Sequence, residues 1–276
     1  MNVYKLVIVL ILILGGLQSN ADQSKTFKII TASYNNSEWY QKNLLSLFVQ
    51  NYRNWHLIYI DDCSTDGTAQ LVEDFVKEHA MDHYVTIVKN KERRGHLANQ
   101  YDAIHACNKD EIIVILDGDD WFAHDGVLSY LNTIYQDPDV WLTYGQFWYW
   151  KRNKKGICKP LPQDILRHGK VRTHRPFTTS HVRTFYAGLY QGIDLQDLCY
   201  QNDLLPMCVD VATMMPMIEM AGTRIRYIDD ILYIYNDSNR LSFFHDRRKQ
   251  QEEIESFIRQ KPAYHPLHAA PWAQGS

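Results

Sequence analysis

The chain has 276 residues, of which 45% are hydrophobic and 22% are charged, and its formal net charge is −3. This length is enough for one large domain or two small ones with a substantial core. The composition is ordinary for a globular protein, and the weak net charge gives no indication of a nucleic-acid partner.

The N-terminus carries a targeting pattern. Lys5 precedes an apolar run from Leu6 to Leu17, and a short polar stretch then ends at Ala21. This order is typical of a secretory signal, and the run is shorter than the roughly 20 residues that span a bilayer. Residues 1–21 are therefore predicted to be a signal peptide cleaved after Ala21. An uncleaved hydrophobic anchor, with membrane association, is the alternative. The mature protein would work in a secretory-pathway lumen, in a periplasm or outside the cell.

Strand and helix signals alternate through the first half of the chain. Short apolar runs predict strands, and capped amphipathic stretches between them predict helices. Such alternation predicts an α/β fold with a mostly parallel central sheet flanked by helices. The predicted strands are 27–31, 55–60, 84–88, 112–116 and 140–144, and the predicted helices are 37–50 (capped by Ser37), 65–79 (capped by Thr65 or Asp66), 97–107 and 126–135.

The second half is less regular. Residues 151–180 are rich in Lys, Arg, His and Pro and predict a long surface excursion, a type of segment that is usually functional or disordered. Further predicted helices are 181–190, 209–221 and 246–259, and further predicted strands are 224–228 and 231–235.

The cysteine pattern is consistent with an oxidising compartment only in part. The number is odd, so at least one thiol is free or paired between chains, and the spacing does not match a zinc site. Two of the last three could form a disulfide. The cysteines are Cys63, Cys107, Cys158, Cys199 and Cys208.

Polar residues follow three of the predicted strands, where ligands bind in parallel sheets. They are Ser33-Tyr34-Asn35, Asp61-Asp62 and Asp117-Gly118-Asp119-Asp120. Packed carboxylates raise one another's pKa unless a cation lies between them, and Mn2+ or Mg2+ prefers oxygen ligands and leaves positions open for phosphate. The last motif therefore suggests a metal site for a phosphorylated substrate, although an acidic turn that caps the next helix is the structural alternative.

Three segments taken together resemble the family 2 glycosyltransferases, which have the GT-A fold. They are residues 30–36, the Asp-Asp-x-Ser-Thr-Asp-Gly-Thr loop at 61–68, and residues 116–121. The loop is the most specific part. The resemblance covers residues 27–145 strongly and 200–240 more weakly. It implies a nucleotide-sugar-binding half at 22–145, an acceptor-binding half at 146–245 and a C-terminal helix and tail at 246–276.

The resemblance also implies a donor nucleotide site. Ala32 and Tyr34 correspond to the loop that packs on the base and ribose. Asp62 corresponds to the acceptor for a uracil N–H, and Asp61 helps to shape its loop.

A metal site is implied by the same resemblance. Asp117 and Asp119 correspond to an Asp-x-Asp pair, with Asp120 close by as a further metal ligand and Asp117 also near the nucleotide. Bound Mn2+ or Mg2+ would bridge the two phosphates and stabilise the leaving nucleoside diphosphate.

The family places a catalytic base at the start of a helix in the second half, often as Glu-Asp. Here Asp210 is the candidate base, although Val209 replaces the usual acid before it. A helix N-cap is the structural alternative for Asp210. Asp203 and Glu219 are weaker candidates for the base.

Two phosphate-binding arginines of the family pattern are missing. Ala98 and Asn236 stand at their positions. Arg94 is the candidate for the first diphosphate contact, and Arg240 or His245 for the second. His245 is also a candidate metal ligand, by analogy with other GT-A enzymes.

The resemblance thus implies metal-assisted transfer of a sugar, from a UDP-sugar as first choice, to an acceptor hydroxyl with inversion at the anomeric carbon. The acceptor stays open between a glycan, a protein and a lipid-linked molecule. A nucleotidyltransferase is the alternative, but residues 30–36 contain neither Gly nor a basic residue for its phosphate loop. A catalytically inactive sugar-binding pseudoenzyme is the third possibility.

Overall fold

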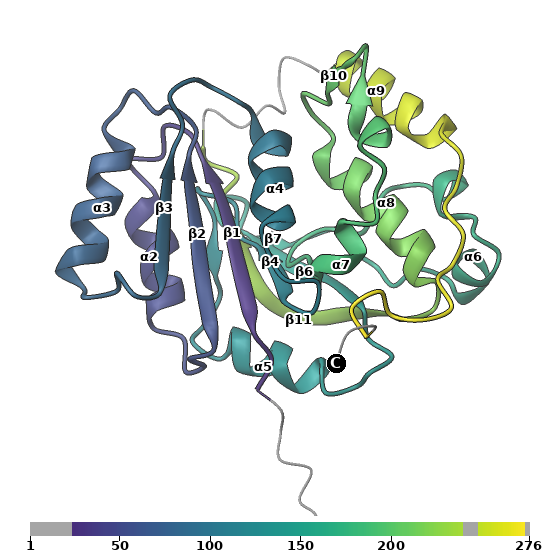
Figure 1. Ribbon diagram of the computed structural model, residues 1–276, viewed down its shortest axis with the longest axis horizontal. Coiled ribbons are helices and arrows are strands. Elements are labelled where there is room, and N and C mark those ends of the chain that lie inside the picture. Colours follow the sequence, from purple (N-terminus) through teal and green to yellow (C-terminus); the bar gives the residue numbers. More distant parts are fainter. Residues whose placement is uncertain (1–23, 240–247, 274–276) are drawn as a thin grey trace, which may run out of the picture.

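The computed structural model describes residues 24–239 and 248–273 (Figure 1). One nine-stranded sheet runs through it. β1, β2, β3, β4, β6 and β11 run in one direction, whereas β5, β7 and β8 run in the other. In spatial order the strands are β3 (Val85–Lys89), β2 (Trp55–Asp61), β1 (Phe27–Ser33), β4 (Ile112–Ile115), β8 (Thr184–Tyr186), β6 (Leu142–Tyr149), β11 (Ile225–Tyr235) and β5 (Trp121–Phe122), with β7 (Lys154–Lys155) paired to β6.

Helices cover both faces of this sheet, as the alternating pattern predicts. One hydrophobic cluster joins the sheet to α2 (Tyr40–Phe48), α3 (Thr68–Glu78) and α5 (Val127–Ile134). The other cluster joins it to α4 (His96–His105), α7 (Ala187–Tyr190), α8 (Val209–Ala221) and α9 (Arg248–Gln260). In Figure 1 α2 and α3 lie to the left, α5 lies at the bottom, and α7, α8 and α9 lie to the right. The shorter elements are α6 (Gln163–Arg167), η1 (Val171–Thr173), η2 (Leu195–Leu198) and a hairpin of β9 (Cys199–Tyr200) and β10 (Asp203–Leu204).

The predicted helix at 181–190 is wrong in its first half. Residues 184–186 form β8, which lies between β4 and β6 and is antiparallel to both, and only Ala187–Tyr190 is helical. The two predicted strands at 224–228 and 231–235 are one strand, β11, with register shifts between Ile228 and Ile231 and between Ile231 and Tyr233. In both places pairing with distant strands decides the structure, and short local patterns do not contain that information.

The predicted capping by Ser37 is also wrong. α2 begins at Tyr40 and its N-cap residue, Trp39, makes no side-chain cap. The Ser37 N–H instead donates to Asp66 Oδ2 at 3.0 Å, and Asp66 Oδ1 accepts from the Thr68 N–H at 3.0 Å. The N-cap of α3 is Gly67 and not the predicted Thr65 or Asp66, but Asp66 still accepts the first N–H of the helix and links the loops after β1 and β2.

A buried ion pair fastens the second half of the chain. The Arg172 guanidinium donates to both oxygens of Glu219, at 2.8 and 2.9 Å, and also to the Ile258 carbonyl at 2.7 Å. Glu219 Oε2 accepts from the Tyr264 N–H as well. One pair of side chains thus connects the 151–180 excursion with α8, α9 and the segment after it. Glu219, a weak candidate for the base, is occupied in this structural role.

The cysteines and the helices bear on the predicted export of the protein. All five cysteines are free thiols, so the suggested disulfide among Cys158, Cys199 and Cys208 is not formed. Within residues 24–239 and 248–273, none of the helices combines the length and the apolarity needed to cross a bilayer. Residues 1–21, predicted as signal or anchor, lie outside the described residues.

Candidate active site

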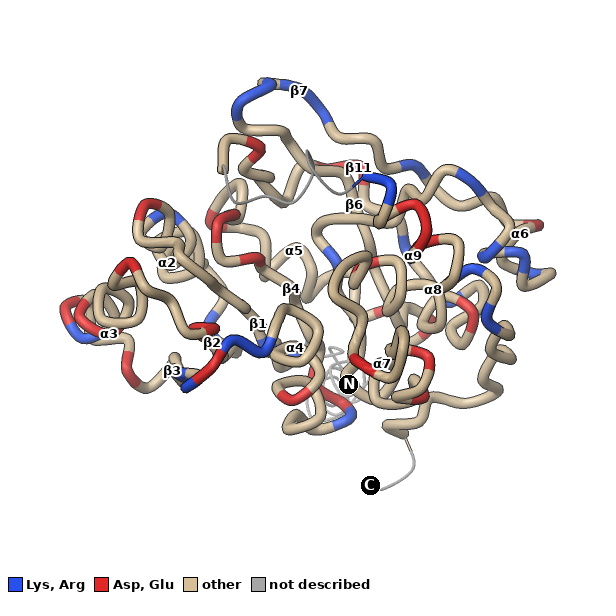
Figure 2. The backbone as a smooth tube through the Cα atoms, turned by 90° about the horizontal axis from the view of Figure 1, so that it is seen from above, with Lys and Arg blue, Asp and Glu red and all other residues tan. Residues whose placement is uncertain are grey.

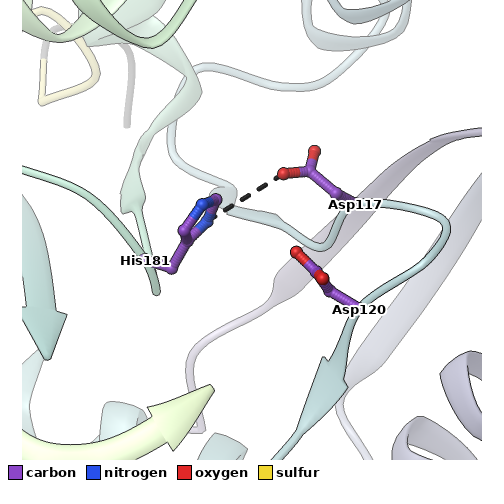
Figure 3. Close-up of side chains that lie close together, drawn as sticks. All are labelled: Asp117, Asp120 and His181. Carbon is purple, nitrogen blue, oxygen red and sulfur yellow. Dashed lines mark ion pairs between the residues drawn. The ribbon is translucent and has the colours of Figure 1, made fainter. Parts of the chain in front are cut away.

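The acidic turn after β4 begins with Asp117, which meets three basic side chains. Arg183 Nη2 lies 3.4 Å from Asp117 Oδ2, His181 Nδ1 lies 3.9 Å from the same oxygen, and His96 Nε2 lies 3.6 Å from Oδ1. Burial raises the pKa of Asp117, but Arg183, His96 and His181 together lower it below its ordinary value. Figure 3 shows the Asp117 carboxylate and the His181 ring facing each other. Asp117 is therefore held as a carboxylate.

Asp120 is buried, and its two oxygens accept hydrogen bonds from residues at the end of β11. Its Oδ2 accepts from the Tyr233 hydroxyl at 2.7 Å, and its Oδ1 accepts from the Asn236 N–H at 2.6 Å. Burial, together with the charges of Asp119 and Asp117, raises the pKa of Asp120 well above its usual value. An added cation beside these carboxylates would relieve that repulsion.

Asp119 points to a different neighbour. Its Oδ2 accepts from the Asn239 side chain at 2.8 Å. Burial raises the pKa of Asp119 to about 6, and the Asp117 charge contributes to this. The first and third carboxylates of the motif are thus closer to the basic groups than the second.

Gly118 allows the turn to lie against the loop after β1. A Cβ added at Gly118 would stand 2.8 Å from Ser33 Cβ, Ser33 Oγ and Asn36 Nδ2, which is closer than real Cβ atoms approach. The Asn43 side chain holds the turn from the other side, since its Nδ2 donates to the carbonyls of Asp117 and Asp120 at 2.9 and 2.8 Å. Packing at the carboxyl ends of β1 and β4 therefore explains the glycine of the motif.

Three residues can offer ligand atoms to one metal ion. Asp117, Asp120 and His181 each place one such atom within 4.8 Å of the others. Asp117 Oδ1 and His181 Nδ1 are buried and have no hydrogen-bond partner. Burial, Arg183 and His96 lower the pKa of His181 to about 3 against the opposing charge of Asp117, so its ring is neutral and a nitrogen lone pair is available. These groups fit a divalent metal. They comprise two of the predicted ligands, Asp117 and Asp120, together with His181, and the predicted Asp119 lies outside this set.

The predicted nucleotide-base residues divide into two roles. Asp62 is saturated within the protein, because Oδ1 accepts from Asn90 and the Arg94 N–H and Oδ2 accepts from the Gly95 N–H, all within 2.9 Å. Burial raises the pKa of Asp62, but these hydrogen bonds outweigh it and lower the pKa. Asp61 binds the Ser64 N–H through Oδ2, and its buried Oδ1 has no partner. Asp62 shapes the loop here, and Asp61 has the free acceptor oxygen.

Tyr34 and Ala32 lie at the end of β1, and both are partly exposed. The Arg93 guanidinium stacks on the Tyr34 ring, 3.6 Å from its centroid. Arg94, the predicted diphosphate contact, instead pairs with Asp102 on the surface of α4, 2.5 Å from Nη1 to Oδ2. The structure thus places Arg93 rather than Arg94 beside the predicted nucleotide loop.

Asp210 stands in the first turn of α8, where its Oδ1 accepts from the Val211 N–H at 2.9 Å. Its position relative to the site follows from His96. Burial lowers the pKa of His96, the charges of Asp117, Asp210 and Asp62 oppose this, and Arg183 adds to it. His96 therefore lies within electrostatic reach of the metal side, the nucleotide side and the candidate base. Asp203, a weaker candidate for the base, is exposed on β10, whereas Arg240 and His245 lie outside the described residues.

Sequence reasoning missed the basic groups that complete the site. Thr179, His181 and Arg183 are buried, and Thr179 Oγ1, His181 Nδ1 and Arg183 Nε have no partner. They directly precede β8, whose pairing with β4 and β6 brings them to the carboxylates. The available signal was a His-x-Arg pattern directly before an apolar run, at the start of the predicted helix at 181–190. Unpaired buried donors and acceptors at one sheet edge indicate a polar ligand.

A separate hollow in the described part of the chain lies between α5 and β11. It measures about 560 Å3 and is lined by α5 and the register shift of β11, including Tyr130 and Asp230. Tyr130 already donates to Asp230 at 2.8 Å, and His124 Nδ1 accepts from the Gly126 N–H. Because these polar groups satisfy one another, the chemistry is assigned to the carboxylate edge and not to this hollow.

Comparisons with known proteins agree with this geometry. Residues 28–192, more than half of the chain, match the family model described as glycosyl transferase family 2. The glycosyltransferase TuaG of Bacillus subtilis is 29% identical over 97 residues, which are 35% of this chain and 37% of TuaG. The chain spans less than half the length of the curated relatives it matches.

Two solved structures share the fold. TarS of S. aureus, in complex with UDP-GlcNAc, has a TM-score of 0.57 and 18% identity, covering 78% of this chain and 59% of TarS 1-349. The mannosyltransferase PcManGT from Pyrobaculum calidifontis, in complex with GDP-Man and Mn2+, has a TM-score of 0.60 and 21% identity, covering 88% of this chain and 67% of PcManGT. These likenesses confirm the predicted GT-A architecture.

Proposed function

Because the chain belongs to glycosyl transferase family 2, we propose that it transfers a sugar from a UDP-sugar to an acceptor hydroxyl, with inversion and with a divalent metal. The observation that carries the proposal is the meeting of Asp117 and Asp120 with His181 and Arg183 at the carboxyl edge of the sheet. This edge is where ligands bind in open α/β sheets. The family membership displaces the nucleotidyltransferase alternative.

The nucleoside end of the donor is assigned to the loop after β1 and to Asp61. Tyr34 and Arg93 offer a stacked surface for a base, and Asp61 Oδ1 is a buried acceptor without a partner. An N–H of a uracil ring would satisfy that oxygen. TarS with UDP-GlcNAc supports a uridine donor, and PcManGT with GDP-Man makes guanosine the main competitor.

The diphosphate end is assigned to the groups around Asp117. Arg183 holds a fixed positive charge in a buried position, and its Nε–H is free to donate to a phosphate oxygen. Fixed charges in a dry site stabilise developing negative charge better than water does. Arg183 thus takes the place of the arginines that the family pattern puts at Ala98 and Asn236.

Asp117, Asp120 and His181 would hold the metal. Bound there, Mn2+ would neutralise charge on the leaving nucleoside diphosphate. A mixed carboxylate and imidazole set suits Mn2+ better than Mg2+, which prefers oxygen alone.

Asp210 is proposed as the base that removes the proton from the acceptor hydroxyl. The supporting observations are its position in the first turn of α8, where the family pattern puts the base, and its charge, which acts on the His96 ring that lies beside Asp117. A base on the side opposite the leaving group gives inversion in a single displacement.

A thermal-shift panel on the folded chain tests the donor site first. UDP, GDP, CDP and dTDP are each added with Mn2+ or with EDTA, since specific binding raises stability as RT ln(1 + [L]/Kd). We expect UDP with Mn2+ to give the largest shift and EDTA to remove most of it. A larger shift with GDP would mean that the donor carries guanosine and not uridine. No shift with any nucleotide would favour the pseudoenzyme. NMR of the anomeric proton of the product then tests inversion.

A further inference from the structure

The hairpin formed by the end of β6 and β7, residues 148–159, is strongly basic. From Trp150 to Lys159 it contains five cations and no carboxylate, in a chain whose net charge is −3. In Figure 2 this hairpin forms the outer rim of the molecule beside β6 and β11, with neighbouring blue segments. Such a concentration of one charge requires an explanation that the donor site does not supply.

Three of these cations are not used within the protein. Arg152 pairs with Asp237 and Lys155 pairs with Asp229. Lys151, Lys154 and Lys159 are exposed and have no ion-pair partner among the residues that the structure describes. Their charges are available to an external anion.

Large apolar side chains stand among the cations. Ile157 is 58% exposed and Trp150 is 48% exposed. The Trp150 ring packs edge-on against Trp121 at 5.2 Å, and Lys42 Nζ lies 4.7 Å from its centroid, which adds a further cation beside it. An exposed Trp and an exposed Ile beside unpaired lysines match the side chains that settle at a bilayer surface.

The tip of the hairpin is held firmly and close to the donor site. The Trp150 N–H donates to the Tyr235 carbonyl at 2.9 Å, and the Lys151 N–H donates to Asp237 Oδ1 at 2.6 Å. The adjacent Asn236 N–H donates to Asp120 Oδ1 at 2.6 Å. The hairpin tip is therefore coupled through β11 and its following turn to the carboxylate cluster.

We propose that the 148–159 hairpin docks on an anionic lipid surface through Trp150, Ile157 and the unpaired lysines. A soluble acidic polymer would satisfy the cations equally well, but it would give no reward for burying Ile157. Only a surface with both negative headgroups and apolar chains can bind the lysines and also bury Ile157 and Trp150. Docking would hold the carboxylate edge near the membrane, where a lipid-linked acceptor would be presented.

This consequence for the acceptor rests on the proposed function, whereas the docking does not. If the chain docks through the hairpin but transfers no sugar, the proposed function is wrong and the docking proposal stands. If the chain transfers sugar but the hairpin does not dock, the docking proposal is wrong and the proposed function stands.

Hydrogen exchange on the full chain tests the docking. Segment 6–17 can bind vesicles by itself, so the readout is confined to the amides of 148–159. Vesicles of phosphatidylcholine are compared with vesicles containing 30% phosphatidylglycerol, and with dextran sulfate in solution. We expect slower exchange in the hairpin only with the anionic vesicles, and less protection as salt screens the lysines. Unchanged exchange, or equal protection by dextran sulfate, would overturn the proposal.

Matched variants separate docking from a general loss of structure. Ile157→Asp is compared with Val49→Asp, since Val49 is 56% exposed on the surface after α2. Lys151→Gln with Lys154→Gln is compared with Lys77→Gln and Lys109→Gln, two exposed lysines elsewhere. Each hairpin lysine removed should weaken the vesicle affinity of the hairpin about fivefold. Equal effects of hairpin and control variants, at equal melting temperature, would also overturn the proposal.

Discussion

The acidic side of the site is made by one continuous turn, whereas its basic side reaches the same place on a strand paired on both sides. Asp117 and Asp120 directly follow β4, and local packing around Gly118 sets their positions. His181 and Arg183 are 64 or more residues away in sequence and reach Asp117 because β8 pairs with β4 and β6. The acidic side therefore depends on local geometry, and the basic side on the packing of the whole second half.

The dependence of the basic side on the packing of the second half is tested by Arg172→Met, for which we expect the largest loss. Arg172→Met leaves Glu219 buried and without its bidentate partner, which should lower the free energy of unfolding by about 3–5 kcal/mol. Urea denaturation measures the change. The matched control is Arg226→Met, which breaks an exposed pair with Asp137 and should cost about 1 kcal/mol or less. Similar losses in the two variants would mean that the buried pair does not fasten the second half.

The acidic side is tested by Asp117→Asn. This change removes a charge that is proposed to bind the metal and is the partner of Arg183, and kcat/KM should fall about a thousandfold. Steady-state kinetics at saturating Mn2+ give the value, and circular dichroism confirms the fold. Asp119→Asn, whose carboxylate binds Asn239, should lose only about tenfold under the same conditions. Equal losses would return the metal to Asp119, as the sequence predicts.

The basic side is tested by Arg183→Met. Its guanidinium is assigned to the diphosphate, so the affinity for UDP should fall about 10- to 100-fold, while the affinity for uridine should be unchanged. Isothermal titration with both ligands separates the two effects. Arg183→Lys keeps the charge and should recover part of the UDP affinity. A parallel loss of uridine binding would instead give Arg183 a structural role.

The success of the sequence predictions follows the same division. The strands at 27–31, 55–60, 84–88 and 112–116 were predicted correctly because each is a short apolar stretch bounded by polar residues, although the 84–88 strand, which is β3 at the sheet edge, is largely exposed. β8 has only three residues and its identity comes from two distant partners, so no local pattern could distinguish it from a helix. Because β8 was missed, the roles of His181 and Arg183 in the site were missed too.

The roles of Asp61 and Asp62 show a finer limit. Both were recognised as important from one loop motif, but a motif does not state which carboxylate is consumed by the protein itself. That depends on where the N–H groups of Arg94 and Gly95 point, about 30 residues further along the chain. The family-derived assignment of the uracil contact to Asp62 stays a prediction. Substitutions at Asp61 and at Asp62 can distinguish which residue makes this contact.

The smallest expected effect comes from comparing Asp62→Asn with Asp61→Asn. Asp62→Asn weakens several hydrogen bonds to a carboxylate and should cost about 1–2 kcal/mol of stability at pH 7. Since the folded pKa of Asp62 lies below its ordinary value of 3.8, this stability is present above that value and disappears as the pH falls through the folded pKa. The stability difference between wild type and variant, measured by urea denaturation, should therefore shrink in acid. Asp61→Asn should leave stability nearly unchanged, because Asn can still accept the Ser64 N–H, but should weaken uridine binding several-fold. If Asp62→Asn weakened uridine binding and Asp61→Asn did not, Asp62 would be the residue that contacts the uracil ring, and the unpaired oxygen of Asp61 would bind another ligand.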